Sequence, residues 1–240
     1  MPDALSILLT VFLAIPATQG DEVRLRQALQ EAGRRLLDYR NELKSFVCQE
    51  TVRWETWRKK GGPRSIQRAR FEFRVLGESE ERTPLSAHAQ QLPILLQGGY
   101  LSALYGLLAP ENQSIYEFRL AASDADPSLF IVEAQVPRDK SHTLLDTEHG
   151  LLAVGYRARI TIQKSDGRVR RLERVIGPVG SIIQLTHLLV YDEVEAGGQS
   201  YLLPVEQETL VLYQGGLRQR NLQRYRDYKK FSSTAKVRFK

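Results

Sequence analysis

Residues 45–57, SFVCQETVRWETW, and residues 68–75, RARFEFRV, decide the fold, because in both runs the side chains alternate with a period of two. In the second run Phe71 and Phe73 alternate with charged residues, the pattern of a strand with one buried face. In the first run one face carries Phe46, Cys48, Val52 and Trp54. Because residues 60–63, KGGP, lie between the runs, they predict an antiparallel hairpin.

Cys48 is the single cysteine of the 240-residue chain. On the alternation it shares a face with Val52 and Trp54, which favours a small buried side chain. Glu50 lies on the same face and departs from the apolar pattern. The alternative is a reactive or metal-bound thiolate, but no Cys or His at a suitable spacing would lower the pKa of Cys48.

The segment before this hairpin, residues 21–45, has the period of a helix. Its apolar positions are spaced by three and four residues, and Asp21 and Glu22 suit the positive end of a helix dipole. The stripe consists of Leu25, Leu29, Ala32, Leu36, Tyr39, Leu43 and Phe46. We expect an amphipathic helix that lies on another element.

Downstream, residues 77–91 are polar and predict a loop, and residues 92–108 predict one or two short apolar helices. Strands are expected at residues 114–120 and 129–136, and then in an antiparallel meander. Short glycine-bearing turns separate the meander strands, which are predicted at 153–163, 168–176, 182–195, 199–213 and 217–229, with a last short strand at 235–239.

These elements predict an α+β fold, mainly β. No crossover is long enough for a parallel unit. We expect a large curved antiparallel sheet, an open half-barrel, wrapped around the N-terminal amphipathic helix and a short apolar helix.

The first twenty residues have the character of an export signal. An apolar run at residues 4–17 is too short to span a bilayer, and small residues at Thr18 and Gly20 suit cleavage near Gly20. The sequence thus predicts a signal peptide at 1–20 and a single domain at 21–240, periplasmic or secreted; an uncleaved anchor is the alternative. The net charge of +6 rises by one on cleavage, because Asp3 is removed. In an exported protein this basic balance favours an anionic membrane surface or an acidic protein over nucleic acid.

Three short motifs carry a resemblance to a known family. After the first helix come Cys48 and Thr51, the strand predicted at 199–213 carries Leu202, Leu203 and Pro204, and the last long strand carries Arg220 and Asn221. The sequence resembles a family of exported, uncharacterised acidobacterial proteins, whose members carry Tyr-Thr-Cys-x-x-Thr, Leu-Leu-Pro and Arg-Asn-x-x-x-Phe at these places. This chain departs from that pattern at Phe46, Val47 and Tyr225.

The order of elements is also similar to the half-barrel of periplasmic lipoprotein carriers and outer-membrane lipoprotein-sorting proteins, in which a sheet wraps a helix and shelters an acyl chain. This second resemblance extends over most of residues 21–240 in element order and carries no motif. It implies a fold and a binding mode, and it does not identify a ligand.

The sequence contains no motif that predicts catalysis, a metal site or a cofactor. The histidines His88, His142, His149 and His187 are scattered, and HExxH, GxSxG, CxxC and phosphate-loop patterns are absent from the sequence. No enzymatic activity is therefore expected.

A basic face is predicted on the last long strand. Arg218, Arg220, Arg224, Arg226 and Lys230 occupy even positions, and Tyr225 points to the other face. With a turn at residues 214–216, Glu206 would lie opposite Arg224. The arginines form either a solvated face of cross-strand ion pairs or a surface for anionic head groups or an acidic partner.

Two functions remain open. The first is a non-enzymatic binding protein that holds a lipid, an acylated peptide or another apolar ligand in the half-barrel. The second is an envelope regulatory or assembly module that binds another protein through its sheet face or edge. For the first, the expected lining residues, which would otherwise be plain core, are Trp54, Phe71, Phe73, Tyr105, Tyr116 and Phe118.

Overall fold

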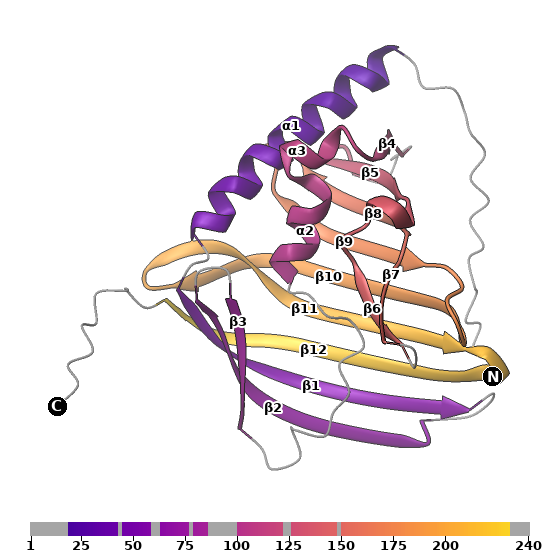
Figure 1. Ribbon diagram of the computed structural model, residues 1–240. Coiled ribbons are helices and arrows are strands. Elements are labelled where there is room, and N and C mark those ends of the chain that lie inside the picture. Colours follow the sequence, from indigo (N-terminus) through magenta and orange to yellow (C-terminus); the bar gives the residue numbers. More distant parts are fainter. Residues whose placement is uncertain are drawn as a thin grey trace.

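The computed structural model describes residues 19–42, 45–58, 63–76, 79–85, 100–121, 126–147 and 150–230. Ten strands form one open antiparallel sheet with the order β3-β2-β1-β12-β11-β10-β9-β8-β5-β4 (Figure 1). These strands are β1 (Phe46–Arg58), β2 (Ser65–Leu76), β3 (Ser79–Pro84), β4 (Glu117–Leu120), β5 (Leu129–Val136), β8 (Tyr156–Gln163), β9 (Val169–Ile176), β10 (Ile182–Ala196), β11 (Gln199–Tyr213) and β12 (Leu217–Lys230). The predicted fold class is confirmed.

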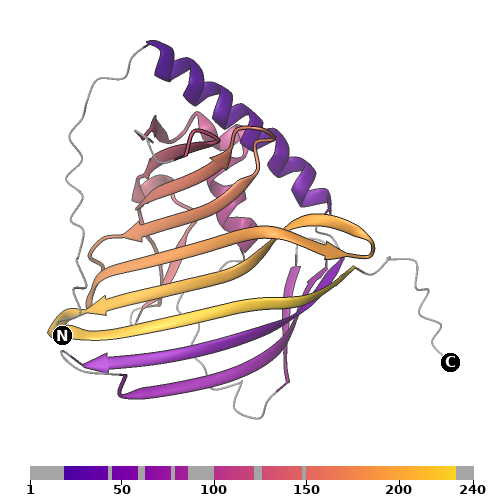
Figure 2. The ribbon, with the colours of Figure 1, turned by 180° about the vertical axis from the view of Figure 1, so that it is seen from behind.

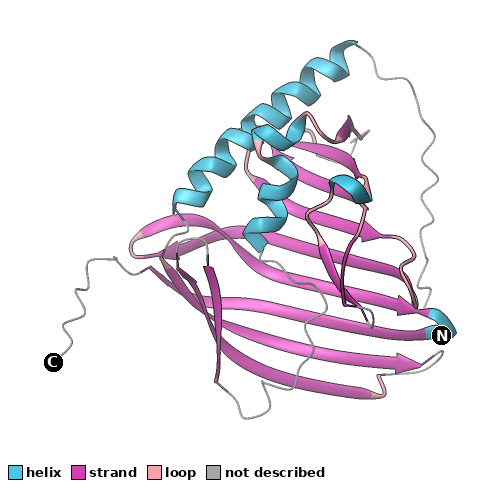
Figure 3. Ribbon diagram, in the orientation of Figure 1, coloured by secondary structure: helices cyan, strands magenta, loops and turns pink. Residues whose placement is uncertain are grey.

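The helices lie on one side of the sheet (Figure 3). They are α1 (Gln19–Glu42), α2 (Tyr100–Leu108) and the short α3 (Pro110–Gln113), and a separate hairpin of β6 (Leu144–Thr147) and β7 (Gly150–Ala153) lies on the same side. We call this side the inner face and the opposite side the outer face. Seen from behind, the long strands present an outer face that no described helix covers (Figure 2).

Helix α1 follows its predicted amphipathic stripe. Ala28, Leu29, Ala32 and Leu36 are buried, whereas Val23 and Leu37 are exposed. The buried side chains join one core cluster with α2 and the inner face of the sheet. The stripe positions Tyr39 and Leu43 lie outside the described side chains, and none of the described helices is long and apolar enough to cross a membrane.

The period-two runs become paired antiparallel strands, as predicted. In β1 and β2 Cys48 lies opposite Phe73 and Val52 opposite Ala69, so the apolar positions of both strands share the inner face. The meander pairs in chain order from β8 to β12 through the short turns that the glycines predict. The sequence therefore predicts this part of the topology correctly.

One prediction at the sheet edge needs correction, and another, at the chain end, lies outside the described residues. The loop expected at 77–91 is wrong over β3, an edge strand that pairs with β2. Its inner positions carry Glu80 and Arg82 in place of apolar residues, so it has no hydrophobic alternation. The strand expected at 235–239, like most of the predicted signal peptide, lies outside the described residues.

A bulge in β12 changes the face of the residues that follow it. Asp227 has a positive φ of 56°, and the register between β1 and β12 shifts between Val47 and Gln49. The extra residue moves Lys230 from the expected basic face to the side of Phe46, where its Nζ donates to the Tyr201 hydroxyl at 2.7 Å.

Candidate functional site

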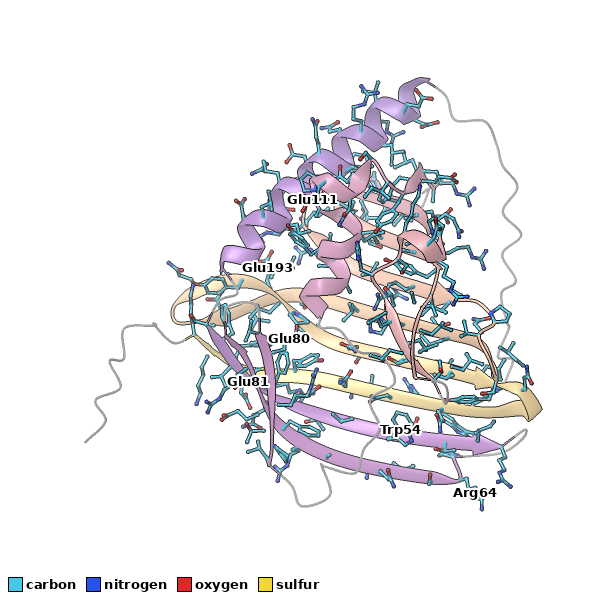
Figure 4. The ribbon with its side chains drawn as sticks, viewed as in Figure 1. Trp54, Arg64, Glu80, Glu81, Glu111 and Glu193 are labelled. Atoms are coloured by element: carbon cyan, nitrogen blue, oxygen red, sulfur yellow. The ribbon has the colours of Figure 1, made fainter. Side chains whose placement is uncertain are left out.

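The predicted lining residues form two groups at different ends of the sheet. Trp54 and Phe73 are buried on β1 and β2, and Phe71 is half-buried beside them. Figure 4 shows Trp54 among the lower strands, far from the helix α3 residue Glu111. The ring of Phe73 packs against Tyr225 of β12, with centroids 5.6 Å apart.

The other three residues lie near α2 and β4. Tyr116 is buried, and its hydroxyl donates to the Lys140 carbonyl at 3.2 Å. Its ring contacts Phe118 at 6.4 Å, and the Tyr105 hydroxyl donates to Glu111 Oε1 at 2.7 Å. All six predicted residues are thus on or beside the core, but they do not form one cluster.

The four arginines of the predicted basic face do share the outer face of β12. Glu206 lies opposite Arg224, as predicted, and Arg224 Nε donates to its carboxylate at 3.0 Å. Arg220 is bound between Glu208, at 2.8 Å, and the buried Glu55, at 3.5 Å. No ion pair with a described residue involves the other two members of the face, Arg218 and Arg226.

A buried ion pair occupies the inner face near the β3 edge. Glu50 is fully buried and accepts from Arg82 Nε at 2.9 Å and from Gln223 Nε2 at 2.8 Å. Burial raises the pKa of Glu50, and the Arg82 charge opposes that shift. Arg82 also lies over the ring of Phe73, 4.8 Å from its centroid. We call Glu50, Arg82, Gln223 and Phe73 the Glu50 cluster. Within it the Glu50 carboxylate forms an ion pair with the Arg82 guanidinium.

Cys48 lies next to this cluster and is only 3% exposed. Burial raises the pKa of its thiol to about 12, and a hydrogen bond with Tyr228 opposes the shift. At neutral pH the side chain is therefore a thiol, which favours the structural interpretation over a reactive thiolate.

A second buried polar group lies on β9 and β10. Arg174 and His187 face each other across the two strands, and Arg174 Nε and Nη2 lie 3.3 and 2.9 Å from His187 Nδ1. Arg174 Nη1 donates to Thr143 Oγ1 at 3.1 Å, and the guanidinium lies 5.5 Å from the ring centroid of Tyr156. Burial lowers the pKa of His187 well below its ordinary value, and the Arg174 charge adds to this, so the ring is neutral.

The bond to Arg174 decides the tautomer of His187. Arginine can only donate, so Nδ1 accepts and the proton lies on Nε2. That Nε2 is buried and has no hydrogen-bond partner in the part of the chain that the structure describes, and the same holds for Asn221 Oδ1 and Gln223 Oε1. Such orphaned buried polar atoms are rare in native proteins and call for an explanation.

These groups belong to one transverse row on five neighbouring strands, which we call the polar row. Its pairings run Arg174 to His187, His187 to Thr209, Thr209 to Asn221, and Asn221 to Trp54. All five side chains are buried. The row crosses the inner face from β9 to β1, and at Arg174 and His187 it is flanked by buried apolar side chains.

A small pocket opens between α1 and the sheet. Its volume is about 20 Å³, room for roughly one water molecule. It is lined by Ala32, Arg35 and Leu36 of α1, Leu104 of α2, Gly167 and Arg168 of the turn between β8 and β9, and Val169, Tyr191 and Leu202 of the sheet. Among the described residues no group of three metal-ligating side chains comes together.

Sequence reasoning missed the polar row and the partner of Glu50. A signal was present, because Arg174 lies between the inner positions Leu172 and Ile176, and His187 lies between Leu185 and Leu189. Glu50 shows the same departure from apolar alternation, because it too is a polar residue at an inner position of a strand. The meander predicts that Arg174 and His187 lie on neighbouring strands, but the partner of Glu50 lies on β3, where the sequence has no apolar period.

No family model matches the chain, and no curated protein matches it. Solved structures that are similar to it include the following three. A LolA superfamily protein from Nitrosomonas europaea is 12% identical, with 90% of this chain and 97% of that chain covered and a TM-score of 0.38. A DUF1329 family protein from Desulfovibrio piger is 11% identical, with 88% and 95% covered and a TM-score of 0.46. An outer membrane lipoprotein-sorting protein domain from Vibrio parahaemolyticus is 11% identical, with 86% and 95% covered and a TM-score of 0.38.

The expected similarity to lipoprotein carriers and sorting proteins thus reappears among solved structures. At these identities and TM-scores the similarities carry no functional inference. The functional argument therefore rests on the side chains of this chain.

Proposed function

We propose that this chain is an exported, non-enzymatic binding protein that holds a lipid, an acylated peptide or another ligand with an apolar chain between α1 and the inner face of its half-barrel. Residues 1–20 would be its signal peptide, and residues 21–240 would be one binding domain. The pocket under α1 is the observation that carries this proposal.

The pocket lies where helix α1 covers the apolar inner face of the curved sheet. Ala32 and Leu36 on the underside of α1 and Val169 and Leu202 on the sheet make its walls apolar. Ligand sites of drug-sized molecules occupy roughly 300–1,000 Å³, so a volume for one water requires α1 to move outward before an acyl chain enters.

The attachment of α1 is compatible with such a movement. Gln113 Nε2 donates to the Leu29 carbonyl of α1 at 2.9 Å and to the Leu108 carbonyl at 2.7 Å. The buried side chains of its underside are apolar and join the shared core, and the Glu31 backbone lies against Gly167 in the turn between β8 and β9. Apolar contacts are non-directional, so an acyl chain can replace them with little loss of free energy.

Both edges of the sheet argue against the alternative of a partner strand. Edge strand β3 is short, carries Glu80, Glu81 and Arg82, and ends at Pro84. Edge strand β4 has four residues and packs beside α1. Charge, proline and short length are the devices that protect an edge from strand addition. On the outer face, a docked protein would have to displace ion pairs such as that of Arg220 with Glu208.

The test is native mass spectrometry of the protein purified from the periplasm, followed by organic extraction and lipid analysis. We expect a stoichiometric co-purifying amphiphile. A fluorescent acyl probe should then bind the emptied protein, and Ala32→Phe, which fills the pocket from α1, should reduce its affinity by about tenfold or more.

Gln30→Phe is the matched control, because Gln30 is exposed on the opposite side of the same helix. It should leave probe binding unchanged. An emptied protein that shows no probe binding would overturn the proposal and favour an envelope assembly module, which pull-down from an envelope extract would then examine.

A further inference from the structure

The polar row contains a cation that the fold does not neutralise. Arg174 is 6% exposed, and its hydrogen bonds go to neutral groups: the ring of His187 and the hydroxyls of Thr143 and Tyr156. Within the described part of the chain no carboxylate forms an ion pair with it. Burial of a charge without an opposite charge opposes folding, so buried cations in proteins are normally paired.

The Glu50 cluster is the internal comparison. There the same inner face buries a guanidinium, Arg82, and places the Glu50 carboxylate 2.9 Å from it. Arg174 has no such partner, although it is the more deeply buried of the two arginines. The sheet thus neutralises the Arg82 charge with the Glu50 carboxylate. It leaves the Arg174 charge to be neutralised by a group from outside the described residues.

The surroundings of Arg174 indicate what that group is. The neighbouring His187 Nε2 is a buried donor without a partner, so donors cluster at this point of the row. On either side the inner positions are the fully buried Leu172, Ile176, Leu185 and Leu189. Two neighbouring hydrogen-bond donors surrounded by apolar side chains fit a ligand with a negatively charged head group and an apolar chain.

The row is also connected to the pocket. His187, Leu189 and Tyr191 follow one another on the inner face of β10, and Tyr191 lines the pocket under α1. The positive charge of Arg174 reaches the Tyr191 hydroxyl, because it opposes the rise in the pKa of Tyr191 that burial causes. A chain that enters under α1 and extends along β10 past Leu189 therefore meets His187 and, opposite it on β9, the Arg174 guanidinium.

We propose that Arg174 and His187 bind the anionic head group, a carboxylate or a phosphate, of an acyl ligand whose chain extends toward the pocket under α1. This inference rests on the proposed function and specifies its ligand class. The Arg174 guanidinium supplies the charge, and the His187 Nε2–H group donates a further hydrogen bond.

The experiment compares three probes of equal chain length: dodecanoate, dodecyl phosphate and dodecanol, each titrated below its micelle concentration into the delipidated protein. We expect both anions to bind about tenfold or more tightly than dodecanol. The ratio between dodecanoate and dodecyl phosphate tells which head group the site prefers, and inorganic phosphate shows how much of the affinity needs the chain.

Arg174→Met should abolish the preference for the anions and leave dodecanol binding unchanged, whereas Arg174→Lys should keep part of it. Arg171→Met is the matched control. Arg171 is exposed on the outer face of the same strand and is paired with Glu173, so its loss should change no affinity. Circular dichroism checks that each variant is folded, and Arg174→Lys keeps the test decisive if Arg174→Met does not fold.

The outcomes separate the two proposals. If all three probes bind equally to the wild-type protein, the anion site is overturned and the binding function stands. If none of the three probes binds, both the anion site and the proposed binding function are overturned. If Arg174→Met folds and still prefers the anions, Arg174 has only a structural role. A carboxyl ¹³C label on bound dodecanoate adds a direct readout, because a neighbouring guanidinium would keep the carboxylate ionised at lower pH than in the Arg174→Met variant.

Discussion

Gly167, in the turn between β8 and β9, packs directly on the backbone of Glu31 in α1. A Cβ atom at Gly167 would lie 2.8 Å from the Glu31 carbonyl carbon and oxygen, and the residue has a φ of +71°. The absence of a side chain therefore lets the helix approach the sheet at this turn.

Gly167→Ala should destabilise the protein and loosen α1. Gly198→Ala is the control, since Gly198 has a φ of +77° and open space around it. Both alanines carry the strain of the left-handed region, about 1–2 kcal/mol, but only Gly167→Ala also displaces α1. We expect it to cost at least about 1 kcal/mol more in denaturant unfolding and to speed hydrogen exchange in α1. Equal losses for the two variants would mean that the close approach does not hold the helix.

Arg82→Met should be strongly destabilising, because it leaves the buried Glu50 carboxylate without its cation. Arg82 keeps a quarter of its side chain exposed, so we take the lower end of the range for broken buried pairs, about 3 kcal/mol. Arg74→Met on the outer face of the neighbouring strand removes a half-exposed partner of Glu72 and should cost under about 1 kcal/mol. Similar unfolding free energies for these two variants would contradict the role given to the Glu50 cluster.

The stability of the protein should depend on pH through Glu50. Burial raises the pKa of Glu50 above its ordinary value of 4.5, against the effect of Arg82. The folded state therefore holds the proton more tightly, so the stability that protonation contributes is complete below pH 4.5 and is lost as the pH rises through the raised pKa.

Glu50→Gln cannot ionise at this position. We expect the unfolding free energy of the wild-type protein to fall relative to that of Glu50→Gln as the pH rises from 4.5. Glu72→Gln, at an outer position of β2, should follow the wild type. A difference between wild type and Glu50→Gln that stays constant with pH would contradict the assigned shift.

Cys48 should be inert in the native protein. With its pKa raised to about 12 from 9.0, the thiolate fraction at pH 8 is about a thousandfold lower than for an ordinary thiol. We expect iodoacetamide to label the native protein very slowly and the protein unfolded in guanidinium readily, as measured by mass spectrometry. Fast labelling under native conditions would show that the strand position is accessible.

Local periodicity was enough to predict most of the sheet. The alternation in RARFEFRV and the glycine turns of the meander predict the β1–β2 pair and the strands from β8 to β12, because a strand with one buried face needs a period of two. The register set by the turn at residues 214–216 placed Glu206 opposite Arg224 correctly. It failed at β3, where the inner side chains Glu80 and Arg82 are charged and leave no apolar period to detect.

The sequence by itself determined the half-barrel class, the amphipathic face of α1 and the outer ion pairs next to a tight turn, since each depends on residues near one another in the chain. Only the tertiary structure decided that Arg82 neutralises Glu50, that Arg174 and His187 meet without a carboxylate, and that Lys230 leaves the basic face. The physical reason is that strand order and a single bulge at Asp227 set which distant side chains share a buried environment. In that environment the free energy of a charge depends on its partner, and the chain order does not reveal the partner.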